Sequence, residues 1–452
     1  MGTNWIKRAL SLPGLLASLA LGLGGGNSAW ADEANATEFQ PEIWSAHVQT
    51  TFTAQYHPAF TSPYRGGNSL DPGSRGWETF DFTFFGGVRL WDGGEAYVNP
   101  EIDQGFGLSN TLGVAGFPSG EAYKIGRANP YIRLQRLFFR QTFDLGGDVE
   151  NVAPGANQLA TTRTENNLVI TAGKIAVVDI FDVNDYAHDP RNDFLNWSII
   201  DSGAFDYAAD SWAYTYGIAA EWTQDWWTWR NGLFDLSRVP NEAELVRGFG
   251  EYELVSEFEA RTDFWARPGK IKLLGYFNRG RMGDYKAAVA LGQSTNALPD
   301  TSLVREPATK PGAALNLQQQ ISDPLGAFLR VSMDDGSKEA YEFTEINRSL
   351  AAGLALKGAS WNRADDTIGL AFVINGISKS AQSYFGAGGL GLLIGDGRLP
   401  HYGSEDIVET YYRASLTDWL GAGLDYQFIG NPAYNRDRGP VSVIAVQLHA
   451  AF

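Results

Sequence analysis

The richest group of side chains with binding chemistry lies in residues 178–197, which are acidic, aromatic and rich in amides. Their oxygens suit either a hard cation or the hydroxyl groups of a polar solute. A calcium loop of the EF-hand type needs a Gly and a terminal Glu at spacings that this segment lacks. Two other interpretations stay open: an ordinary surface loop, or a loop folded into a barrel lumen, where its polar groups can be satisfied. The residues that supply oxygens are Asp179, Asp182, Asn184 and Asp185.

No arrangement typical of a catalytic or metal centre accompanies this segment. The histidines show no HExxH or other metal-ligand spacing, and there is no G-x-S-x-G elbow. With 52 Asp and Glu residues in the chain, a pair of carboxylates carries little information. We therefore expect no enzymatic activity, no metal and no cofactor. The five histidines are His47, His57, His188, His401 and His449.

The elements that must position such a loop alternate between apolar and polar residues. In a strand over residues 77–90, Phe80, Phe82 and Phe84 share one face and Arg89 lies on the other, because alternate residues of a strand point to opposite faces. The first face suits lipid, and the second suits a wet lumen. The following strand, residues 95–101, would direct Glu95, Tyr97, Asn99 and Glu101 inward.

Residues 251–261 alternate most sharply. Glu251, Glu253, Glu257 and Glu259 fall on one face. Burying ionised carboxylates in a dry core is costly, so we expect this face to contact water inside a barrel. The alternative is the exposed face of a soluble sheet.

The N-terminal residues predict export. Lys7 and Arg8 precede an apolar stretch that ends near a small-x-small cleavage site at Ala29-Trp-Ala31, which is typical of a signal peptide over residues 1–31. No later apolar run approaches the roughly 20 residues of a spanning helix, so a membrane location requires a barrel. The chain has no Cys, and its net charge of −17 argues against nucleic acid as a partner. We expect residues 32–452 to form a single all-β domain.

The remaining alternation extends this pattern to the C-terminus. Residues 441–452 place Ile444, Val446, Leu448 and the terminal Phe452 on one face, as in a strand that closes a membrane barrel. Residues 91–95 and 145–148 are expected to be hairpin turns. Residues 105–130, with a possible short helix, and 175–200, 279–323 and 376–404 are expected to be long loops. Further strands are expected at 47–57, 131–143, 165–175, 204–222, 226–235, 269–279, 324–333, 339–357, 365–376, 404–416 and 418–429, with 204–222 and 339–357 each open to being split.

Several stretches in the first half of the chain, in order, resemble the carbohydrate-selective porins of the OprB family. The second half matches mainly in its strand pattern and in Phe452. The matching stretches are Tyr56-His-Pro-Ala-Phe-Thr-Ser-Pro-Tyr64 with Asn68-Ser-Leu70, Gly87-Val-Arg-Leu-Trp91 with Glu95-Ala-Tyr-Val-Asn-Pro-Glu101, Gln104-Gly-Phe-Gly-Leu-Ser109, Arg136-Leu-Phe-Phe-Arg140, residues 168–174, residues 178–197 and Gly203-Ala-Phe-Asp-Tyr-Ala-Ala-Asp210.

The resemblance implies a transmembrane antiparallel barrel of 16 strands in the outer membrane of a Gram-negative bacterium, with a third loop folded inward as a constriction. It implies passive diffusion of glucose and related small neutral sugars, contact with outer-membrane lipid and lipopolysaccharide, and recognition of Phe452 by the barrel-insertion machinery. Monomer and trimer both remain open. Together with inward parity, it suggests these pore-lining residues: Arg89, Glu95, Tyr97, Asn99, Glu101, Arg136, Phe138, Arg140, Asp179, Phe181, Asp182, Asn184 and Asp185, with Phe85 as a further stacking residue.

Two alternative functions remain open. The acidity of the chain and the glutamate face of residues 251–259 favour a general or cation-preferring pore. A soluble secreted β-protein is a further alternative. Asp189 and Arg191 are expected to pin the loop by an ion pair, and Trp197 is expected to be a packing or girdle residue.

Overall fold

The structure is a computed structural model that describes residues 39–122, 126–243, 245 and 248–452. The chain divides into two units, Met1–Gln40 and Pro41–Phe452, and the second contains all the described strands. The predicted signal peptide, residues 1–31, lies outside the described residues.

The described residues form sixteen antiparallel strands that close into a barrel, so the predicted fold class is confirmed. Each strand pairs with its neighbours in sequence, and β1 also pairs with β16, which removes both sheet edges. The strands are β1 Trp44–His57, β2 Arg75–Trp91, β3 Gly94–Gly105, β4 Arg127–Val152, β5 Thr161–Ile175, β6 Thr215–Gln224, β7 Trp227–Asp235, β8 Tyr252–Phe264, β9 Arg267–Gly283, β10 Arg305–Gln320, β11 Leu325–Asp334, β12 Arg348–Gly358, β13 Arg363–Gly376, β14 Glu405–Thr417, β15 Leu420–Gly430 and β16 Val441–Ala451.

Side-chain alternation sets the two surfaces of the barrel. In β16, Ile444 and Val446 are exposed on the outside, whereas Val443 and Ala445 are buried inside. Phe452 extends the seam, since its backbone N–H donates to the Val48 carbonyl at 2.9 Å. In the described part of the chain, no helix is long and apolar enough to cross a membrane.

Some predicted boundaries were wrong. Strand β10 lies inside residues 279–323, which the sequence analysis predicted to be a loop. The strand was missed because its prolines and the run of glutamines at 318–320 interrupt the apolar alternation. The predicted strand 204–222 begins only at Thr215 as β6, and the predicted strand 339–357 begins only at Arg348 as β12.

The predicted hairpin turn at residues 145–148 is also wrong. These residues lie within β4, where Gly146 and Gly147 adopt φ of 101° and 93° and the register against β5 shifts. Glycine tolerates this backbone region, so the ladder bulges there instead of turning. The turn comes later, at residues 153–160, which we call the hairpin tip.

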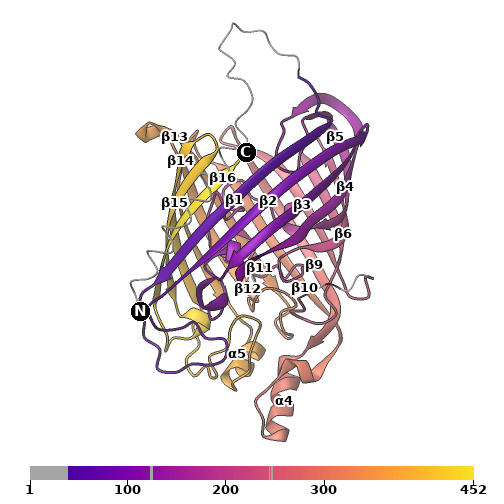
Figure 1. Ribbon diagram of the computed structural model, residues 1–452. Coiled ribbons are helices and arrows are strands. Elements are labelled where there is room, and N and C mark those ends of the chain that lie inside the picture. Colours follow the sequence, from indigo (N-terminus) through magenta and orange to yellow (C-terminus); the bar gives the residue numbers. More distant parts are fainter. Residues whose placement is uncertain (1–38, 123–125, 244, 246–247) are drawn as a thin grey trace. The chain divides into compact units, whose positions relative to one another are not determined.

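The two ends of the barrel differ in the length of their connections. One end carries short turns, such as those between β2 and β3 and between β14 and β15. The other end carries long loops that include helices α4 (Tyr285–Thr295) and α5 (Lys379–Gly386), seen at the bottom of Figure 1. This asymmetry is typical of outer-membrane barrels.

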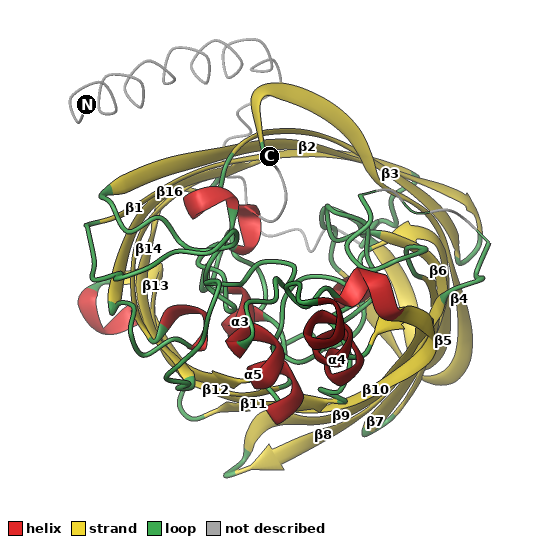
Figure 2. Ribbon diagram, turned by 90° about the horizontal axis from the view of Figure 1, so that it is seen from below, coloured by secondary structure: helices red, strands yellow, loops and turns green. Residues whose placement is uncertain are grey.

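The longest connection, residues 176–214 between β5 and β6, folds into the lumen, and we call it the inward loop. It contains the short helices η3 (Val177–Asp179) and α3 (Trp197–Ile200), and Figure 2 shows α3 among loops inside the ring of strands. Trp197 is buried between Phe117 and Phe343, with ring centroids 5.2 and 5.3 Å away. It is therefore a packing residue, not a girdle residue.

The glutamate face of β8 points inward, as predicted. The predicted contact of this face with water is wrong. Glu253 and Glu257 are fully buried, and each accepts a backbone N–H of the inward loop at 2.8 Å, from Ala208 and Asp182. Glu259 is nearly buried and lies 2.9 Å from Arg230. Hydrogen-bond donors from the loop and the wall thus take the place of water at these carboxylates, while one oxygen of Glu253 has no partner among the described residues.

Candidate functional site

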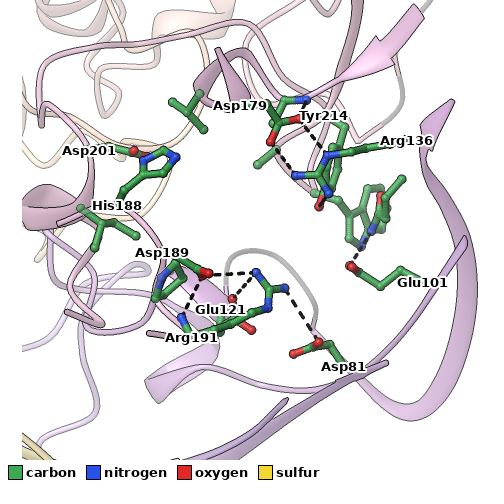
Figure 3. Close-up of a pocket in the computed structure, with 18 of the residues that line it drawn as sticks. Asp81, Glu101, Glu121, Arg136, Asp179, His188, Asp189, Arg191, Asp201 and Tyr214 are labelled. Carbon is green, nitrogen blue, oxygen red and sulfur yellow. Dashed lines mark hydrogen bonds and ion pairs between the residues drawn. The ribbon is translucent and has the colours of Figure 1, made fainter. Parts of the chain in front are cut away.

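A polar cavity of about 360 Å³ lies between the inward loop and the wall formed by β2, β3 and β4 (Figure 3). Strand parity supplies the wall residues, because Asp81, Glu101 and Arg136 occupy inward positions of three adjacent strands. The inward loop supplies Asp179, Asp189, Arg191 and Tyr214, and the β3–β4 loop adds Glu121.

Arg136 and Asp179 form the first charged pair of the cavity. The Arg136 Nε and Nη2 atoms donate to the two carboxylate oxygens of Asp179 at 2.8 and 2.6 Å. Tyr214 lies beside the pair, with its ring centroid 4.9 Å from the guanidinium carbon. A bidentate pair fixes the guanidinium plane and leaves further N–H groups and lone pairs on the cavity side.

Arg191 forms a second charged centre with three acids. Its guanidinium lies 3.2 Å from Glu121, 3.7 Å from Asp189 and 3.8 Å from Asp81. The expected ion pair between Asp189 and Arg191 is therefore present, and a 3.0 Å hydrogen bond from the Arg191 backbone N–H to the same carboxylate reinforces it. Arg191 also joins the inward loop to the β3–β4 loop and to β2.

The loop carboxylates differ in their proton affinity. Burial raises the pKa of Asp179, but the ion pair with Arg136 and the N–H of Ala176 outweigh it and hold the pKa below its usual value. Asp189 behaves in the same way because of Arg191. At Glu121, burial and the nearby Asp81 raise the pKa well above its usual value, although Arg191 opposes this. The cavity therefore holds two guanidinium groups among a larger number of carboxyl groups, with carboxylates that are ionised at neutral pH beside a carboxyl that takes up a proton readily.

Only part of the predicted set of pore-lining residues lines this cavity. Glu101, Arg136 and Asp179 do, as does Phe85. Glu101 accepts hydrogen bonds from Thr83 at 2.6 Å and from Gln135 at 3.2 Å.

A second group of predicted residues gathers beneath the hairpin tip. Tyr97 and Phe138 are buried and stack on each other, with ring centroids 4.9 Å apart. The polar members of this group hydrogen-bond to the tip or to one another: Arg89, Glu95, Tyr97, Asn99 and Arg140.

The third group lies on the far side of the inward loop. Phe181 packs edge-on against Phe234, and Asn184 donates to Asn316 at 2.7 Å. Asp182 is buried and accepts from the Ser202 backbone N–H at 2.6 Å. Asp185 lies 3.2 Å from Lys270 and lines a separate cavity of about 380 Å³ near the short turns.

The calcium interpretation gains no support from this arrangement. Asp179 pairs with Arg136 and Asp185 with Lys270, whereas Asp182 and Asn184 both contact Asn316. Across the described ranges, no group of three or more acids or histidines is placed to hold a metal ion.

Sequence reasoning missed Asp81, Glu121, Arg191 and Tyr214 as residues of this cavity. Asp81 had a usable signal, because it shares the inward parity of Arg89. The other three lie in loops, where strand parity says nothing about direction.

Residues 67–452 match the family model described as "Carbohydrate-selective porin, OprB family". The chain belongs to the OprB family. The high-pH structure of Pseudomonas putida OprB superimposes with a TM-score of 0.69 at 16% sequence identity, covering 90% of this chain and 94% of that one. The low-pH structure of the same porin gives 0.50 at 11% identity, covering 90% and 92%. No curated protein sequence matches at a significant level.

Membership in the OprB family makes the chain a carbohydrate-selective porin of the Gram-negative outer membrane. Family and fold are those of a channel.

Proposed function

We propose that this OprB-family porin lets glucose and related small neutral sugars diffuse through the polar cavity, which serves as its constriction. The observation that carries the proposal is the lining itself. Guanidinium donors from Arg136 and Arg191 stand beside carboxylate acceptors from Glu101, Asp179 and Asp189, and each cation is already paired.

Such a lining suits neutral polyhydroxylated solutes. Each sugar hydroxyl is both donor and acceptor, so it can bridge a guanidinium and a carboxylate without bringing a charge. The cavity volume of about 360 Å³ lies within the range of small-molecule sites. A pore also needs binding that is weak enough to release its solute, and groups that are already paired provide this.

The cation-preferring alternative loses part of its support. It rested on the acidity of the chain and on the glutamate face of β8, and in that face Glu253, Glu257 and Glu259 are occupied by the inward loop or by Arg230 and Lys272.

Purified full-length protein in planar bilayers tests the proposal. As glucose is added, the single-channel conductance should fall reversibly and saturate, because an occupied constriction excludes ions. A dextran too large to enter serves as the control for viscosity. A linear decline that matches the dextran control would refute sugar binding in the pore.

A further inference from the structure

The hairpin tip, residues 153–160, departs from the other connections at its end of the barrel. Strand β4 runs on to Val152, and most of its last ten residues are exposed. The chain then returns to the inner surface, where Leu159 is fully buried and Ala160 is 6% exposed. A short-turn connection that folds back inside thus adds an inward segment from this end of the barrel.

Polar contacts fix the second half of the tip, residues 157–160, to the barrel wall. The Leu159 N–H donates to the Tyr97 hydroxyl at 3.1 Å, and the Ala160 N–H donates to Glu42 at 2.7 Å. Arg89 donates to the Ala160 carbonyl at 3.1 Å, and Arg140 donates to the Asn157 carbonyl at 2.9 Å. These contacts give the predicted pore-lining group around Tyr97 a positioning role.

Asn157 stands where the tip meets the constriction. It and Ala156 line the same cavity as Arg136 and Asp179. The Asn157 side-chain oxygen accepts from Asn99 at 2.9 Å, which directs the amide group and occupies its acceptor. The amide nitrogen makes no hydrogen bond to any residue that the structure describes, so a donor remains at the cavity surface.

We propose that the hairpin tip forms part of the wall of the constriction, and that Asn157 is a specificity-determining residue that donates a hydrogen bond to a sugar hydroxyl passing Arg136 and Asp179. The sugar then contacts a segment from the short-turn end and a loop from the opposite end at once. This inference rests on the proposed function and adds a contact residue to it.

The absence of cysteine from the chain allows a clean test. We would introduce Asn157→Cys into the full-length protein and treat single channels with a cationic methanethiosulfonate reagent. Modification should lower the conductance in one step, because the added group lies in the constriction. Glucose should slow modification about three- to tenfold, as expected for occupancy of a site held by ordinary hydrogen bonds.

Asn151→Cys provides the matched control, because Asn151 lies on the same hairpin but is exposed and outside the cavity. Its modification should leave the conductance unchanged. In a second variant, Asn157→Ala should weaken the glucose block about three- to tenfold while the barrel inserts normally.

The outcomes separate the two proposals. If modification at position 157 leaves the conductance unchanged while glucose still blocks the unmodified channel, the tip is not a wall of the constriction, and the proposed function stands. If modification lowers the conductance but glucose neither blocks nor protects, the location of the tip stands, and the sugar contact and the proposed function fail together.

Discussion

The inward loop has two faces that satisfy their charges in different ways. Toward β2, β3 and β4, Asp179 and Arg191 pair with side chains of opposite charge around an open cavity. Toward β8 and β14, the wall carboxylates Glu257 and Glu409 accept backbone N–H groups of the loop.

This difference distinguishes carboxylates that anchor the inward loop from carboxylates that line the cavity. A wall carboxylate that accepts backbone N–H groups fixes the path of the chain, because those donors cannot move without unfolding the loop. A carboxylate that is paired with a guanidinium keeps free lone pairs, and its partner keeps free N–H groups, so a passing hydroxyl can share them. Both faces are acidic, yet only one can take part in transport.

The largest change in conductance should come from removing Arg330, which helps to anchor the inward loop to the wall. This residue is 1% exposed, donates to the Ile199 carbonyl at 2.8 Å and lies 3.5 Å from Asp182. Arg330→Ala leaves a buried carboxylate without its cation, at a cost of about 3–5 kcal/mol. The loop should detach, and the single-channel conductance should rise severalfold in bilayers.

Arg330→Lys keeps the charge and should give a much smaller rise. The distinction between the two faces fails if Arg330→Ala folds, as judged by heat-modifiable migration on gels, and conducts like the parent protein.

On the cavity face, Arg136→Gln removes the charge and keeps a polar side chain. The glucose concentration for half-block should rise about tenfold, since hydrogen bonds from charged groups contribute about 1.5–3 kcal/mol. The conductance should change far less, because the loop keeps its anchors. Arg133→Gln is the control: it is on the same strand and pairs with Asp210 at 3.5 Å, but it does not line the cavity. An equal loss of block at Arg133 would show that the effect is structural.

The smallest effect should be the pH dependence of stability that Asp201 causes. This residue lies just after α3. Burial, followed by the nearby Asp182, raises the pKa of Asp201 to about 7, against the opposing effect of Arg330. Because the folded pKa exceeds the unfolded value of about 3.9, the contribution of Asp201 to stability is fully present below pH 4 and is lost as the pH rises toward 7. Between pH 6 and 7 the loss is about 1 kcal/mol.

Asp201→Asn should remove this dependence. Open-channel noise from loop movement should increase between pH 6 and 7 in the parent protein and stay level in the variant. Parallel increases in both proteins would assign the titration to another group.

Strand parity predicted the direction of the wall residues well but not their roles. Glu257 and Arg136 both point inward, as their alternation indicates, yet Glu257 is an anchor and Arg136 lines the cavity. Their roles depend on the path of the inward loop, which long-range contacts set and no local pattern encodes. Arg140 shows the same limit, because it donates to the carbonyl of Asn157 and does not line the cavity.

The seam between β1 and β16 has a consequence for assembly. Gln55 on β1 donates to Pro118, and Gln447 on β16 donates to Pro190, so segments within the lumen contact both of the strands that meet last. Closure joins residues from opposite ends of the sequence, a type of contact that forms slowly. A loop that already lies on the sheet when the ring closes does not have to fold into the lumen afterwards. We therefore infer that the lumenal segments gather on the open sheet first, and that the final strand encloses them as it docks.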